Sequence, residues 1–109
     1  FRGVLRTGFL FGYRIMEKIF EKVVEIVSER TGASFEMIKS DRHEEYVSYR
    51  ILLINALSKL GFSDTAIASK LGITRQGVNL LKSKMDSRLK HSLVLSSIWQ
   101  EISKALASN

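Results

Sequence analysis

The sequence predicts an all-α fold, a compact bundle of about five helices that contains a helix-turn-helix. The chain has 109 residues, no proline and only seven glycines, so little in it would interrupt a helix. Apolar residues recur at intervals of three and four along most of the chain, which is the period of an amphipathic helix. One segment, residues 68–81, carries small, turn and capping residues at the spacing of two helices joined by a tight turn. A chain of this length can bury one core, so we expect a single domain.

Residues 1–15 show no helical stripe, and we expect the first helix to open at Met16. This stretch carries three arginines and no acid, namely Arg2, Arg6 and Arg14. Three interpretations are open: the stretch is not native and Met16 is the natural start, it is a weak signal or transit segment, or it is a flexible basic arm that reaches a minor groove or phosphates. We therefore divide the chain into residues 1–15 and a single helical domain at 16–109.

The first expected helix runs from Met16 to about Thr31, with an apolar stripe opposite an acidic face. Gly32 can take the positive φ that ends a helix. Ser34 is the expected N-cap of a short helical turn at 35–38. The predicted core residues of these two elements are Ile19, Phe20, Val23, Val24, Ile26, Val27, Phe35 and Ile38.

A polar segment leads into a second long helix, which is expected over 45–60 and ended by Gly61. Phe62 fills the junction after it, and Ser63 or Asp64 caps the helix that follows. The predicted core residues of the long helix are Val47, Ile51, Ile54, Ala56, Leu57 and Leu60.

The next two helices form the expected helix-turn-helix. Ala68 is small enough for the close approach of two steeply crossing helices, Gly72 can adopt a left-handed turn, and Thr74 can cap the second helix. Val78 and Leu81 then point back at the first helix. The residues expected on the outward face are Arg75, Gln76, Asn79, Lys82 and Ser83.

Beyond this motif the apolar stripe continues through Leu81, Met85 and Leu89, and we place a break at 90–92. A final amphipathic helix follows. Its apolar face consists of Leu95, Ile98, Trp99, Ile102 and Leu106. We interpret Trp99 as a core residue, and a homodimer through this last helix also fits the pattern.

Positive charge gathers on and just after the second helix of the motif. The net charge is +6, and residues 70–90 contain six basic residues against one acid, Asp86. Such a surface is the electrostatic footprint of a protein that binds nucleic-acid phosphates, although ordinary solvated surfaces can also be basic. Because charge and motif coincide, we expect double-stranded DNA as the partner.

Two kinds of DNA contact are expected from these helices. A guanidinium can pair with guanine and a side-chain amide with adenine, so the predicted base-reading residues are Arg75, Gln76 and Asn79. Phosphate contacts position a protein without specifying a sequence, and the predicted ones are Lys70, Thr74, Lys82, Ser83, Lys84, Arg88 and Lys90. Gly77 costs about 1 kcal/mol relative to alanine inside a helix. It would allow either a close approach to the DNA backbone or a tight helix–helix contact.

Nothing in the sequence indicates an enzyme. Cysteine is absent, His43 and His91 have no partners at metal-ligand spacing, and no nucleophile–base set can be assembled. There is no glycine loop of the nucleotide-binding type and no apolar run long enough to cross a bilayer. We therefore expect no catalysis, cofactor, metal, small-molecule substrate or membrane, and a cytoplasmic, nucleoid-associated protein.

Residues 24–81 resemble the DNA-binding domain, domain IV, of the bacterial replication initiator DnaA. Three blocks carry the resemblance in the same order: a helix end with a short segment at 30–40, a basic segment leading into a long helix at 42–60, and the helix and glycine at 62–72. A shorter window, residues 66–90, also resembles region 4 of sigma factors and simple repressors. The longer resemblance implies an all-α helix-turn-helix fold and double-stranded DNA as partner.

The chain departs from that family at the family's signature, a Gly-Arg-Asp-His-Thr-Thr-Val string. Only its glycine and valine are kept here, as Gly72 and Val78, and the family's basic loop contains acids here. The resemblance therefore implies the fold and DNA binding, but not binding of the replication-origin box. It also implies a phosphate contact from Arg50, whose alternative is an ion pair with Glu44 or Glu45.

Two classes of function are thus open. The first is a bacterial helix-turn-helix protein that binds double-stranded DNA, for which a sequence-specific role in transcription regulation or a role in a mobile element would fit. The second is a protein-interaction adaptor that uses the same fold and has lost its DNA contacts. Salt separates them, because DNA binding weakens steeply as salt rises and a mainly apolar protein contact does not.

Overall fold

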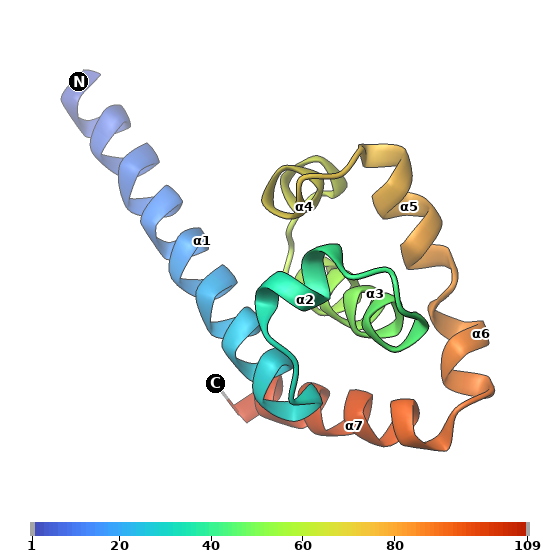
Figure 1. The fold of residues 1–109 in the computed structure, drawn as a ribbon. Helices are drawn as coiled ribbons and strands as arrows, with labels where there is room; N and C mark the ends of the chain where they lie inside the picture. The colour runs from blue at the N-terminus through green and yellow to red at the C-terminus, as the bar shows by residue number, and fades with distance from the viewer. Residues whose placement is uncertain (1, 109) are drawn as a thin grey trace.

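The computed structural model describes residues 2–108, with side chains described from residue 12 onward, and this part of the chain is entirely helical between its turns. Seven α-helices occur within it and no strand, which confirms the predicted all-α fold (Figure 1). They are α1 (Arg2–Thr31), α2 (Phe35–Ser40), α3 (Glu44–Lys59), α4 (Asp64–Leu71), α5 (Arg75–Ser83), α6 (Met85–Lys90) and α7 (Leu93–Ser108).

Helix α1 is continuous from Arg2, so the prediction that it opens at Met16 is wrong. The glycines in this stretch do not end the helix. Glycine weakens a helix, but unlike proline it neither removes a backbone hydrogen bond nor clashes with the preceding turn. Space around Gly12 is open, and Figure 1 shows the first half of α1 extending beyond the remaining helices. The predicted arm is therefore helical over its described backbone, whereas the side chains of Arg2 and Arg6 lie outside the described ones.

The core is built around α3, which contacts each of the other six helices. The side chains of α3 that are buried are Ile51, Leu52, Leu53, Ile54, Ala56 and Leu57. Leu60, predicted to be buried with them, is 40% exposed. The helix ends one residue earlier, and the chain turns at Gly61 with φ of 99°, so Phe62 enters the core instead.

Three predicted helix ends are confirmed by backbone geometry. Gly32, Gly61 and Gly72 have positive φ, and within the described residues no other residue type does. These angles suit glycine because it has no Cβ to clash in the left-handed region.

Helix α5 ends earlier than the apolar stripe predicted. Lys84 separates α5 from α6, and its N–H donates to Leu81 O at 3.1 Å, which is the tighter bonding of a terminal turn. The Ser83 hydroxyl competes for a nearby carbonyl by donating to Leu80 O at 2.7 Å. Met85, the first residue of α6, lies in the core, where it is 7% exposed. The predicted break at 90–92 is confirmed, since α6 ends at Lys90 and α7 begins at Leu93.

Candidate nucleic-acid interface

Helices α4 and α5 are joined by a short turn whose hydrogen bonds fix both helix ends. Gly72 has φ of 69° and ψ of 32°, and its N–H donates to Ala68 O. Ile73 N also donates to Ala68 O, at 3.1 Å. Thr74 then caps α5, because its hydroxyl oxygen accepts from Gly77 N at 3.0 Å. The predicted turn and cap residues therefore occupy the expected positions, and Ala68 is buried beside them.

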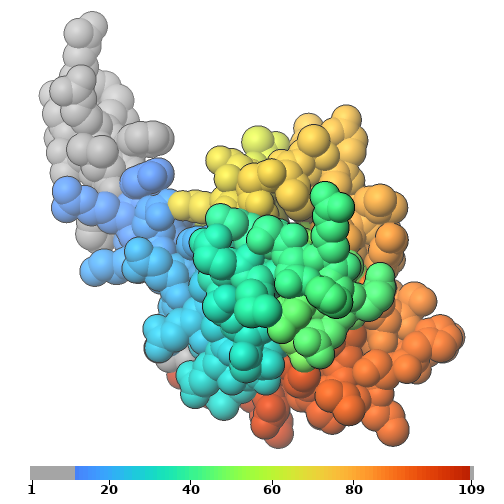
Figure 2. Space-filling view, in the orientation of Figure 1, coloured from blue at the N-terminus to red at the C-terminus, as the bar shows by residue number. Residues whose placement is uncertain are grey.

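One face of α5 is anchored in the core and the opposite face meets solvent. Val78 is fully buried and Leu81 is half-buried. The exposed residues of α5 are Arg75, Gln76, Asn79, Leu80 and Ser83, which we call the α5 outer face. At 100° per residue these five positions form one continuous stripe. Figure 2 shows α4 and α5, in yellow to orange, meeting solvent side by side.

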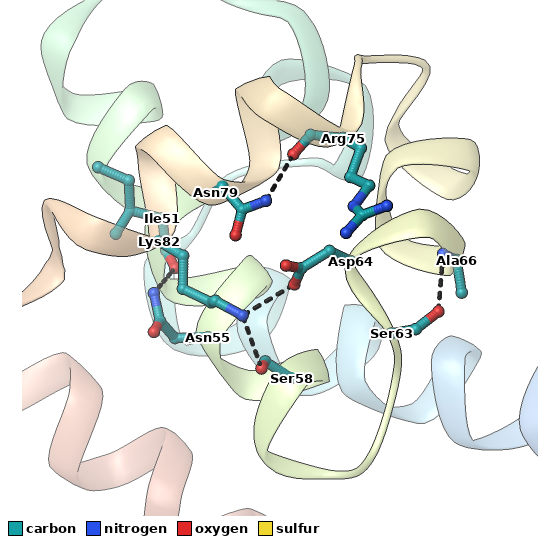
Figure 3. Close-up of polar contacts among 9 residues, drawn as sticks. All are labelled: Ile51, Asn55, Ser58, Ser63, Asp64, Ala66, Arg75, Asn79 and Lys82. Atoms are coloured by element: carbon teal, nitrogen blue, oxygen red, sulfur yellow. Dashed lines mark hydrogen bonds and ion pairs between the residues drawn. The ribbon is translucent and has the colours of Figure 1, made fainter.

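All three predicted base-reading residues lie together on this face. Arg75 and Gln76 are the first two residues of α5, and Asn79 follows one turn later. The Asn79 side-chain amide donates to Arg75 O at 3.3 Å (Figure 3), whereas the guanidinium of Arg75 makes no ion pair with any described side chain. The three therefore share one exposed surface at the N-terminal end of α5.

The electrostatics of this end favour an anion. Residues 71–85 contain no acid. The N-terminus of a helix also carries partial positive charge from its unpaired amides. Asp64 of α4 is drawn near this end of α5 in Figure 3, and its carboxylate already accepts a hydrogen bond from Lys82.

Lys82 was expected to face outward, and the structure corrects this. Its ammonium lies 2.8 Å from Asp64 Oδ1 and 3.5 Å from Ser58 Oγ (Figure 3). Lys82 lies one turn after the buried Val78, so it is at the edge of the packed face rather than on the outer face. The side chain thus joins α5 to α4 and α3.

Lys70 and Arg88, two other predicted phosphate contacts, are also held within the protein. Lys70 pairs with Glu17 of α1 and lies over the Phe20 ring, 4.9 Å from its centroid. Arg88 donates to Ser48 Oγ at 2.8 Å and pairs with a Glu44 oxygen at 2.8 Å. Both cations therefore connect helices that are far apart in sequence.

Arg50 makes neither of the ion pairs that the sequence offered. Its Nε donates to Ile38 O at 2.7 Å and its second terminal nitrogen donates to Asp41 O at 2.6 Å. Arg50 therefore satisfies carbonyls at the C-terminal end of α2, where helix carbonyls lack backbone partners. Burial lowers the pKa of this guanidinium from its ordinary value. The prediction that it pairs with Glu44 or Glu45 is wrong.

The remaining predicted phosphate contacts lie at the surface. Lys84 and Lys90 are exposed at the two ends of α6, and neither makes an ion pair within residues 12–108. Thr74 and Ser83 are exposed as well, but their hydroxyls already bond to the backbone of α5. Lys84 and Lys90 are therefore the predicted phosphate cations with free ammonium groups.

Gly77 lies against the residues of the turn before α5. A Cβ built on it would lie 3.2 Å from Thr74 Oγ1 and 3.9 Å from Ile73 Cδ1, with no atom of another helix among its three nearest contacts. The predicted tight helix–helix contact is therefore wrong. The alternative, a close approach to DNA, stays a prediction.

Sequence reasoning missed Leu80, which is 59% exposed on the α5 outer face. The apolar stripe drew attention to Leu81 instead. The signal that could have found Leu80 is its position four residues after Gln76, which places both on the same side of a helix.

The two histidines bond to oxygen acceptors nearby in the chain. His43 Nδ1 lies 2.6 Å from Asp41 Oδ1, and this hydrogen bond raises the pKa of His43, while hydrogen bonds from His43 lower the pKa of Asp41. His91 Nδ1 lies 2.7 Å from Ser87 O. Among the described residues, no three side chains of the types that bind metals gather into a possible site.

Comparison of the chain with models of protein families, with curated proteins and with solved structures gave no match in any of the three. The resemblance to DnaA domain IV therefore stays a prediction from the sequence. Over residues 2–108, each helix is too short or too polar to cross a bilayer.

Proposed function

We propose that this protein binds double-stranded DNA, with α4 and α5 acting as a helix-turn-helix and α5 lying in the major groove. The observation that carries the proposal is the α5 outer face. It is exposed, free of acids, held by a hydrogen-bonded turn, and opened by an unpaired arginine. An α-helix fits the major groove, which is about 12 Å wide, and helix-turn-helix proteins contact bases with the N-terminal residues of the second helix.

In this arrangement Arg75 pairs with guanine, and Gln76 or Asn79 pairs with adenine. Each good bidentate pair is worth about 1–3 kcal/mol of discrimination against the wrong base. Arg75 and Gln76, at the start of α5, are exposed, and their side chains make no hydrogen bond to residues 12–108. Neither side chain must therefore break a hydrogen bond to reach a base.

The phosphate contacts of the proposal are fewer than the sequence suggested. Of the six basic residues in 70–90, three are paired with acids of the protein itself, namely Lys70, Lys82 and Arg88. Because Arg75 is assigned to a guanine, Lys84 and Lys90 remain to neutralise phosphates. Lys82 and Arg50 act instead as positioning residues, because they hold α5 and the end of α2 in place.

We add to the proposal a sequence-specific role in bacterial transcription regulation and a location at the nucleoid in the cytoplasm, which would fit a free-standing DNA-binding domain. A homodimer would use the start of α7, where Leu93 and Val94 are 88% and 72% exposed. Ile98 and Trp99, further along α7, pack against the core instead.

The proposal is tested by titrating a random-sequence duplex with wild type, Lys84→Ala and Lys104→Ala at two salt concentrations. Lys84 follows α5 directly, and Lys104, an exposed lysine of α7, serves as the control for loss of one positive charge. We expect salt-sensitive binding that Lys84→Ala weakens and Lys104→Ala retains. Absence of binding at low salt would refute the proposal and favour the protein-interaction adaptor.

A further inference from the structure

Leu80 is the single apolar side chain on the α5 outer face. It is 59% exposed, although Val78 two residues earlier is fully buried. Gln76 precedes it by one helical turn on the same side, and Asn79 adjoins it. The core does not require a leucine at this position, since Leu81 supplies the neighbouring packed side chain.

A thymine in the major groove offers the chemistry that such a leucine fits. Each A·T pair presents the thymine C5-methyl group there, beside the hydrogen-bonding groups of adenine. An apolar side chain can contact the methyl group and cannot satisfy the donors and acceptors of a G·C pair. A glutamine one turn away can form two hydrogen bonds with adenine N6 and N7.

We infer that the α5 outer face recognises thymine-containing duplex DNA, with Leu80 contacting a thymine methyl group and Gln76 reading an adenine. This inference rests on the proposed DNA binding and names its base preference. Four residues of helix rise by about 6 Å, which is close to the height of two stacked base pairs. The two side chains would therefore reach base pairs about two steps apart.

The test compares two probes that differ only in the methyl group: an alternating A·T duplex of 30 base pairs and the same duplex with uracil in place of every thymine. Fluorescence anisotropy would measure affinity for wild type, Leu80→Ala and Leu60→Ala. Leu60 is an exposed leucine at the end of α3, away from the α5 outer face, and serves as the matched control. Circular dichroism would verify that each variant keeps its helices.

We expect wild type and Leu60→Ala to bind the thymine duplex about fourfold more tightly than the uracil duplex, the effect of burying one methyl group. Leu80→Ala should bind both duplexes equally, with the salt dependence of wild type. Equal affinity of wild type for the two duplexes, with binding still weakened by Lys84→Ala, would overturn the inference and leave DNA binding intact.

Two further outcomes are decisive. Thymine preference that persists in Leu80→Ala would overturn the role of Leu80. Lack of binding to either duplex at low salt would overturn the inference together with the proposed function, and would make Leu80 part of a protein-binding surface.

Discussion

Replacing Lys82 by methionine should destabilise the fold and leave the electrostatics of DNA binding unchanged. The substitution keeps the apolar stem of the side chain and removes the ammonium that pairs with Asp64. The pair spans 2.8 Å, and its side chains are 32% and 22% exposed. Its contribution to stability should therefore lie between two limits. Exposed ion pairs contribute about 0.2–1 kcal/mol, and loss of one partner of a buried pair costs more.

A coupling energy of about 1 kcal/mol between Lys82 and Asp64 follows from this position. Urea unfolding of Lys82→Met, Asp64→Ala and the double variant would measure it as a double-mutant cycle. A loss of this size lowers Tm by about 4–8 °C in a domain of 60–100 residues, and slightly less in this chain. The coupling should shrink in 1 M salt, because the pair is partly exposed to screening.

Two results would refute this reasoning. A coupling energy indistinguishable from zero would mean that the ion pair does not hold α5 against α4. A salt slope of DNA binding that becomes shallower by about 0.9 in Lys82→Met would mean that Lys82 neutralises a phosphate after all.

Three other predictions concern the cap, the dimer and the effect of pH. Thr74→Ala removes the N-cap of α5 and should lower the free energy of unfolding in urea by about 1 kcal/mol. Thr74→Ser should restore most of this loss. Equal stability of all three proteins would contradict a stabilising role of the cap. If a homodimer forms, Leu93→Asp/Val94→Asp should give a monomer in analytical ultracentrifugation at a concentration where wild type is dimeric; a dimer that survives the change places the interface elsewhere. The His43–Asp41 hydrogen bond raises the pKa of His43 and lowers the pKa of Asp41. Its contribution to folding stability is therefore full between about pH 4 and 6.5. It is lost as pH rises through the folded pKa of His43 or falls through that of Asp41, and the stability difference between wild type and His43→Ala should shrink from pH 5.5 to pH 9.

Helix ends set by local chemistry could be predicted from the sequence. Gly32, Gly61 and Gly72 end helices because a left-handed residue is needed there, and Ser34 and Thr74 cap helices through their own hydroxyls. These features depend on contacts within about four residues. The periodic core residues were predictable for the same reason, since a buried face repeats at helical period.

The partners of the basic residues could not be predicted in this way. Lys70, Lys82 and Arg88 meet acids 53, 18 and 44 positions away, on α1, α4 and α3. Their exposure depends on how helices pack, and a count of charges along the chain does not contain that information. The start of α1 was missed because glycine alone does not end a helix.

The salt dependence of binding to duplex DNA tests the central claim most directly. Two unpaired phosphate contacts, Lys84 and Lys90, predict a slope of about −1.8 in log affinity against log salt concentration. Engagement of all five basic residues of 70–90 other than Arg75 would give about −4.5 and contradict the ion pairs seen here. A slope near zero, or no binding at all, would contradict DNA recognition by α5.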